Sequence, residues 1–78
     1  MNKKIKVYGV PGCPFCKRTK EFLKSKGLNF KDIDVATDHN LAKEMVEKSG
    51  QMSVPVIEIG GEIVIGFDKE KIEALLRS

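Results

Sequence analysis

The chain has 78 residues, a length that suits one domain, since domains contain about 50 to 250 residues. Apolar residues make up 41% of the chain and charged residues 32%, which is typical of a globule and not of a disordered tail. No apolar run approaches the roughly 18 residues of a membrane span, and the polar start of the chain does not resemble a secretory signal. The 2 cysteines are too few to staple a secreted miniprotein, so we expect a protein of the reducing cytoplasm.

The net charge of +3 is distributed unevenly along the chain. Residues 1–26 carry eight basic side chains and one acidic one, whereas residues 27–78 carry six basic and ten acidic side chains. A basic segment of this kind can mark nucleic-acid or membrane binding, or can favour a small anionic ligand near one end of the fold. It is also typical of a solvated, lysine-rich helix face, so charge alone leaves these alternatives open.

The first third of the chain predicts a strand, a helix and a second strand. Residues 5–10 are short, β-branched and partly alternating, which predicts a strand that ends at Pro11-Gly12. From Pro14 to about Lys26 the side chains recur at helical spacing, and Gly27 suits the end of that helix. The residues at this spacing are Phe15, Thr19, Phe22 and Leu23. Residues 28–35 alternate cleanly and predict a half-buried strand.

A second helix is predicted in the middle of the chain. Thr37 or Asp38 can cap its start, and the apolar periodicity ends near Gly50. The residues of its apolar face are Leu41, Ala42, Met45 and Val46. Met45 and, beyond the helix, Met52 are interpreted as core or gap-filling residues.

The last third predicts a hairpin and a final helix. Residues 54–59 form a strand, Gly60-Gly61 a tight turn, and residues 62–65 the returning strand. Asp68 can cap the last helix, whose inward residues are Ile72, Leu75 and Leu76. The order βαβαββα predicts an α/β fold with a four-stranded mixed sheet covered by three helices, its first half parallel and its hairpin antiparallel.

The Cys13-Pro14-Phe15-Cys16 segment lies where a strand ends, a turn follows and a helix begins. Pro14 suits the first helical position, so Cys13 falls at or next to the N-cap, at the positive end of the helix dipole. Cysteines at such positions have pKa values of about 3.5–7.5 instead of about 8.5, which favours the thiolate. Positive charge nearby comes from Lys17, Arg18 and Lys20. Cys13 is therefore the predicted nucleophile.

Cys16 follows Cys13 by one helical turn, which suits the roughly 4.4–6.8 Å between Cα atoms that a disulfide requires. Because Cys16 lies further inside the helix, we expect it to be less exposed and to act as the resolving thiol. A structural zinc site needs four ligands and only His39 remains, so no metal is predicted. A structural disulfide is disfavoured in a reducing cytoplasm, whereas Cys-X-X-Cys near a βαβ pattern indicates a redox motif.

Together these residues resemble the glutaredoxins of the thioredoxin-fold superfamily. Cys13-Pro14-Phe15-Cys16 is similar to the family's Cys-Pro-Tyr-Cys, and Ser53-Val54-Pro55 is similar to its Thr-Val-Pro. Gly66-Phe67-Asp68 is similar to the Gly-Gly…Asp segment that opens the last helix of the family. The likeness covers residues 4–77 with the same order of elements. It implies a thioredoxin fold in a single glutaredoxin-like domain over residues 1–78.

The resemblance also implies where glutathione, the family's cosubstrate, binds. The proline matching Pro55 is cis and faces the first cysteine, and the backbone of the residue matching Val54 pairs with a peptide-like substrate. The helix start at Asp68-Lys69 holds the γ-glutamyl end, Gln51 reaches the glycyl carboxylate, and Phe15 keeps a flat apolar face. The implied glutathione-binding residues are Phe15, Gln51, Val54, Pro55, Gly66, Phe67, Asp68 and Lys69.

Two positions depart from the family pattern. Glutaredoxins often place a lysine three residues before the first cysteine, where this chain has Val10, and their second glycine is Phe67 here. Gly66-Phe67 is similar to the small redoxin that supplies electrons to class Ib ribonucleotide reductase and is recharged by thioredoxin reductase. Pro14, in turn, favours a true glutaredoxin. The predicted function is a glutathione-dependent thiol–disulfide oxidoreductase acting on glutathionylated or protein disulfides, with the reductase-charged redoxin as the alternative.

Other classes of function are weighed against this prediction. A nucleic-acid module would show aromatic pairs that stack on bases, and Tyr8 is the only Tyr or Trp. An iron–sulfur carrier is less expected in this family when proline follows the first cysteine, as it does after Cys13. An interaction domain with an inert disulfide is a further alternative. We expect a monomer without a tightly bound cofactor, with glutathione or thioredoxin reductase as electron source and disulfide-containing proteins as substrates, and with no nucleic acid or membrane as partner.

Overall fold

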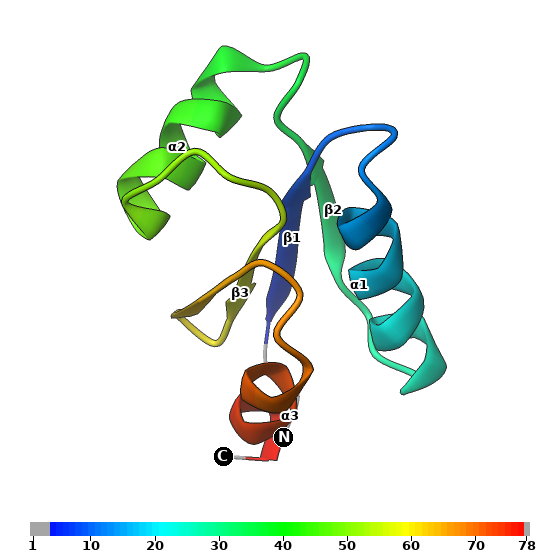
Figure 1. Ribbon diagram of the computed structural model, residues 1–78. Helices are drawn as coiled ribbons and strands as arrows, with labels where there is room; N and C mark the ends of the chain where they lie inside the picture. The colour runs from blue at the N-terminus through cyan, green and yellow to red at the C-terminus, as the bar shows by residue number, and fades with distance from the viewer. Residues whose placement is uncertain (1–3, 78) are drawn as a thin grey trace.

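The computed structural model describes residues 4–77, and its helices and strands follow one another in the predicted order βαβαββα (Figure 1). Four strands and three helices are present in these residues. Their bounds are β1 Ile5–Gly9, α1 Pro14–Ser25, β2 Lys31–Asp34, α2 His39–Ser49, β3 Val56–Ile59, β4 Glu62–Ile65 and α3 Lys69–Arg77. None of the helices in the described range has the length and apolar character needed to cross a membrane.

The strands form one mixed sheet in the order β2-β1-β3-β4. β1 is parallel to β2 and antiparallel to β3, and β3 is antiparallel to β4, as the sequence predicts. Tyr8 pairs with Ile33 on one side and with Val56 on the other, and Val56 pairs in turn with Ile65. The carboxyl ends of β1, β2 and β4 therefore lie at the same edge of the sheet as the amino end of β3.

The helices form a layer on each face of the sheet, with α1 and α3 on one face and α2 on the other (Figure 1). Side chains alternate between the faces, because successive residues of a strand point to opposite sides. The buried cluster under α1 and α3 consists of Ile5, Val7, Leu23, Ile57, Ile59, Val64 and Ile72. The cluster under α2 consists of Tyr8, Ile33, Met45 and Val56. Full burial of such a side chain stabilises the fold by about 1.5–3 kcal/mol, so the apolar contacts on both faces of the sheet contribute to the stability of the fold.

Side-chain caps fix where two of the helices begin. The Asp38 carboxylate accepts hydrogen bonds from the backbone N–H groups of Asn40 and Leu41 at 2.9 and 3.2 Å, so Asp38 and not Thr37 caps α2. The Asp68 carboxylate accepts the backbone N–H of Lys71 at 3.2 Å, as expected for the residue that opens α3. These bonds satisfy donors that have no partner within the helix itself.

Three predicted strands are shorter than the sequence pattern indicates, the first of them by Val10 alone. Residues 28–30 lie outside β2, because the Leu28 N–H donates to the Leu23 carbonyl at 3.1 Å and completes the end of α1. Residues 54–55 lie outside β3, since Pro55 has no N–H to donate and its carbonyl instead accepts the Gly66 N–H. Hydrophobic alternation therefore extends beyond the hydrogen-bonded strands.

Two apolar residues lie at the surface instead of in the core. Phe15, one of the residues at helical spacing in α1, is 53% exposed, whereas its neighbour Cys16 is buried. Met52, interpreted from the sequence as a core or gap-filling residue, is 79% exposed in the loop between α2 and β3. Met45, in contrast, is buried as predicted.

Candidate active site

Three loops meet at the edge of the sheet where β1, β2 and β4 end and β3 begins. Cys13 follows β1, the Val54–Pro55 peptide precedes β3, and Gly66 follows β4. The Val54–Pro55 bond is cis, as the resemblance to glutaredoxins implies. The Gly66 N–H donates to the Pro55 carbonyl at 2.8 Å, so the end of β4 is joined directly to the cis-proline loop. Strand register thus places Cys13, Pro55 and Gly66 at one end of the molecule.

Cys13 is the N-cap residue of α1, with Pro14 at the first helical position. The backbone N–H of Cys16 donates to Cys13 Sγ at 3.3 Å, so the sulfur takes the role that an oxygen has in an ordinary cap. Gly12 has a φ of +82°, and the turn that it forms returns the Cys13 N–H to the Val10 carbonyl. The predicted position of Cys13 at the helix start is confirmed.

The surroundings of Cys13 favour its thiolate. Partial burial by itself raises the pKa of the Cys13 thiol, but four effects outweigh it. These are the hydrogen bond from the Cys16 side chain, the bonds from the backbone N–H groups of Cys16 and Phe15, and the charge of Lys20. The pKa of Cys13 therefore lies below its ordinary value, because each of these groups stabilises the negative sulfur.

The environment of Cys16 has the opposite effect. Cys16 is 1% exposed, and this burial, together with its hydrogen bond to Cys13 and the charge there, raises the pKa of its thiol to about 11. Its sulfur packs against the backbone of Gly9, where an added Cβ atom would come within 2.8 Å of Sγ. Because glycine has no side chain, position 9 leaves room for the Cys16 sulfur. Cys13, whose pKa is lowered, and Cys16, whose pKa is raised, are one helical turn apart.

We expect the two thiols to differ in their reaction with iodoacetamide. Below about pH 8.5, the ordinary pKa of a free cysteine, Cys13 reacts at least about tenfold faster than Cys16, because only the thiolate is the nucleophile. The Cys13 rate levels off at a lower pH than the Cys16 rate, which continues to rise until the pH reaches about 11. Mass spectrometry of quenched samples locates the label. Equal labelling of both residues at neutral pH would contradict the pKa assignments.

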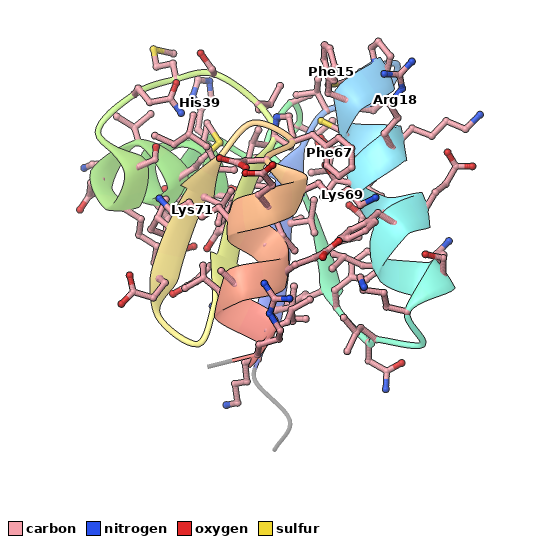
Figure 2. All side chains as sticks on the ribbon, turned by 60° about the horizontal axis from the view of Figure 1, so that its bottom comes forward. Phe15, Arg18, His39, Phe67, Lys69 and Lys71 are labelled. Carbon is pink, nitrogen blue, oxygen red and sulfur yellow. The ribbon has the colours of Figure 1, made fainter. Side chains whose placement is uncertain are left out.

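Two aromatic residues expected to bind glutathione lie beside α1, Phe15 in its first turn and Phe67 in the segment before α3 (Figure 2). The Phe15 ring is exposed in the first turn of α1, and the Arg18 guanidinium lies 5.6 Å from its centre. Phe67 packs edge-to-face against Phe22 of α1, with ring centres 5.7 Å apart. Figure 2 shows Phe67 and Lys69 beside α1, and the Lys69 ammonium lies 5.8 Å from the Phe22 ring centre. The start of α3 and the segment before it thus pack against α1 through aromatic and basic side chains.

The other residues expected to bind glutathione hold their own loops in shape. The Gln51 side chain donates to the Ser53 carbonyl at 3.2 Å and accepts the Ser53 N–H at 2.8 Å, so it braces the loop before the cis-proline. Val54 is half-buried and Pro55 is fully buried. In this conformation Gln51 has a local structural role that the sequence pattern alone does not indicate.

Two features of the site are missed by motif reading. Gly9 is one, because a strand glycine gives no sign of the sulfur that packs against it. The ion pair between Lys20 and Asp32, at 2.9 Å, is the other, because the sequence indicates only that Lys20 is a positive charge near Cys13. The spacing of four residues between Cys16 and Lys20 places both on one helix face. The described residues contain no group of three or more His, Cys, Asp or Glu side chains that could hold a metal ion.

Fold and site together define a class: a thioredoxin fold that presents a Cys-X-X-Cys pair at a helix start is a dithiol redox protein. The glutaredoxin family model matches residues 5–64. Glutaredoxin 3 of Escherichia coli is 38% identical over 66 residues, which cover 82% of this chain and 77% of the relative. The chain belongs to the glutaredoxin family, whose members are thiol–disulfide oxidoreductases.

A second relative is more similar in sequence and size. An uncharacterized glutaredoxin-like 8.6 kDa protein of the rubredoxin operon of Clostridium pasteurianum is 50% identical over 72 residues, which cover 92% of this chain and 96% of the relative. Among solved structures, a glutaredoxin from Archaeoglobus fulgidus matches with a TM-score of 0.89 at 34% identity. The match covers 97% of this chain and 88% of the Archaeoglobus chain. The glutaredoxin-like NrdH-redoxin of Escherichia coli, described as having a thioredoxin-like activity profile, has a TM-score of 0.82 at 26% identity, with 92% and 93% covered.

Proposed function

We propose that the protein is a glutathione-dependent oxidoreductase that reduces glutathionylated proteins and protein disulfides through Cys13. The observation that carries the proposal is the position of Cys13 Sγ, which caps α1 and accepts the Cys16 N–H at 3.3 Å. A sulfur held there in a lowered-pKa state is ready to attack a disulfide. The buried thiol of Cys16 one turn behind it is placed to close the second half of a dithiol cycle.

With a glutathionylated protein as substrate, one thiol is sufficient. The Cys13 thiolate attacks the glutathionyl sulfur, a Cys13–glutathione bond forms, and the electron pair of the broken bond leaves on the protein thiolate. A glutathione thiolate then attacks the same sulfur, glutathione disulfide forms, and Cys13 leaves as the thiolate. The route consumes one free glutathione, and the glutathione disulfide contains it together with the glutathionyl group taken from the protein.

With a protein disulfide, both cysteines take part. Cys13 forms a mixed disulfide with one substrate sulfur and releases the other as a thiolate. Cys16 loses its proton and attacks Cys13 Sγ, so that the Cys13–Cys16 disulfide forms and the second substrate sulfur leaves. Glutathione then reduces the Cys13–Cys16 disulfide and restores both thiols. This route requires Cys16 and the first does not.

The glutathione site proposed here lies between the cis-proline loop and the start of α3. The Val54 backbone pairs with the cysteinyl part of glutathione as an added strand would, next to Pro55 and Cys13. The γ-glutamyl carboxylate binds at the start of α3, where the first N–H groups of a helix attract anions. The further contacts proposed are Phe15, Gln51, Gly66, Phe67, Asp68 and Lys69. We also propose that the protein acts as a monomer in the cytoplasm, where glutathione keeps thiols reduced.

A specific observation favours a second candidate function, a redoxin recharged by thioredoxin reductase. Phe67 stands where glutaredoxins have glycine and packs on Phe22, so an aromatic side chain occupies the opening of α3. Val10 cannot supply the positive charge of the lysine that is frequent at its position. The likeness to NrdH-redoxin supports the same alternative.

The experiment that separates the two functions is a disulfide-reduction assay with two reductant systems side by side. One contains glutathione, glutathione reductase and NADPH, and the other thioredoxin reductase and NADPH. We expect turnover with the glutathione system, which would make Val10 and Phe67 tolerated departures. Turnover with thioredoxin reductase alone would contradict glutathione dependence and assign the protein to the redoxin alternative.

A further inference from the structure

Lys20 is held beside the second cysteine by a residue of another element. It lies one helical turn after Cys16 on α1, and its Nζ is 2.9 Å from the Asp32 carboxylate of the neighbouring strand β2. Side chains of a helix point toward its amino end, so the Lys20 side chain extends back toward the level of Cys16. The Lys20 side chain is 26% exposed, so its charge is less screened than that of a free surface lysine.

A pocket of about 280 Å³ opens at this place. Its lining residues are Gly9, Val10, Pro11, Lys20, Asp32 and Asp34. One of them, Gly9, packs against the Sγ of Cys16, and the backbone of its neighbour Val10 lowers the pKa of the Cys16 thiol. The pocket lies on the β2 side of β1, whereas the cis-proline loop and β4 lie on the β3 side. The pocket and the proposed substrate site therefore lie on opposite sides of β1.

The charged groups around Cys16 come from two elements. On α1, Cys13 and Lys20 act on Cys16, and β2 contributes Asp32, which pairs with Lys20, and Asp34, which lines the same pocket. The charge of Lys20 lowers the pKa of Cys16, against the larger effects of burial and of Cys13 that raise it. Lys20 is thus a positive group acting on a thiol that must ionise before it can attack.

We propose that Lys20, anchored by Asp32, is a positioning residue for the resolving step, where its charge stabilises the Cys16 thiolate. In that step Cys16 gives its proton to solvent, its sulfur bonds to Cys13 Sγ, and the substrate sulfur leaves with the electron pair of the broken mixed disulfide. The inference rests on the proposed function, since it concerns the second half of the dithiol cycle. Asp32 acts through Lys20, because it keeps the long lysine side chain from extending into solvent.

Stopped-flow reaction with dithiobis(nitrobenzoate), a chromogenic aromatic disulfide, tests the proposal. Attack by Cys13 releases one coloured thiolate in a first phase, and attack by Cys16 on the resulting mixed disulfide releases the second in a later phase. The two phases separate the two proposals, because a missing first phase in the unaltered protein contradicts the role of Cys13. The Lys20 charge also lowers the pKa of Cys13, so the inference about the resolving step is judged from the rate of the second phase, after the first is complete. The second phase is followed as a function of pH.

We expect Lys20→Gln to slow the second phase about fivefold near neutral pH, and the loss to disappear at alkaline pH. Lys20→Arg, which keeps the charge, should restore the rate, and Asp32→Asn should slow it less than Lys20→Gln does. Lys24→Gln removes a charge from an exposed position one turn further along α1 and is the matched control. An unchanged second phase in Lys20→Gln, an equal loss at every pH, or an equal loss in Lys24→Gln would overturn the proposal.

Discussion

Replacement of Cys13 by serine is expected to abolish turnover with both reductant systems, by more than about 10³-fold. The reacting group is a thiolate, and a serine hydroxyl does not ionise near neutral pH under the influences that lower the pKa of Cys13. Cys16 cannot replace the lost nucleophile, because it is buried and its pKa is raised to about 11. Coupled oxidation of NADPH, with a glutathionylated peptide and with a protein disulfide as substrates, measures the loss.

The same variant is expected to fold normally, which makes the loss of activity interpretable. Serine is among the preferred N-cap residues, and its oxygen can accept the Cys16 N–H that Cys13 Sγ now accepts. The free energy of unfolding should therefore change by less than about 0.5 kcal/mol or increase. Thermal unfolding checks this point. Substantial activity in a folded Cys13→Ser protein would exclude Cys13 as the nucleophile.

The order of elements could be predicted from the sequence because local patterns specify it. Asp38, Gly50 and Asp68 mark helix ends by their side-chain or backbone chemistry, and the structure places them there. The ends of the strands were less predictable. Leu28 alternates with its neighbours as a strand residue would, but its N–H is used by the end of α1, and Pro55 has no N–H at all. Strand limits depend on hydrogen bonds to other segments, and the hydrophobic pattern does not contain them.

The candidate site likewise contains some features that the sequence predicts and others that it does not. The place of Cys13 at the start of α1 follows from its neighbours in the chain, and the cis form of Pro55 came only from the resemblance to glutaredoxins. The contact of Gly9 with Cys16 and the pairing of Lys20 with Asp32 join different elements, so they depend on the packing of α1 on the sheet. Residues that tune the reactive groups through such contacts are visible only in the folded chain.

Replacement of Cys16 by serine is expected to separate the two proposed routes. Reduction of a protein disulfide should fall by more than about a hundredfold, because no thiol remains to resolve the mixed disulfide. Removal of glutathione from a glutathionylated peptide should remain within about threefold of the unaltered protein, since that route uses Cys13 and free glutathione only. The two substrates are compared in the glutathione reductase assay. Equal loss of both activities would contradict the one-thiol route.

Comparison of Cys16→Ser with Cys16→Ala should then show how Cys16 acts on Cys13. Both variants lack the resolving thiol, but only serine keeps a side-chain donor for the hydrogen bond that lowers the pKa of Cys13. We therefore expect the Cys13 pKa, measured from the pH dependence of its alkylation, to be higher in the alanine variant. The one-thiol rate near neutral pH should be lower there as well, because a smaller fraction of Cys13 is ionised. Identical pH profiles for the two variants would mean that the Cys16 side chain contributes nothing to the thiolate, leaving the backbone N–H groups at the start of α1 as its main support.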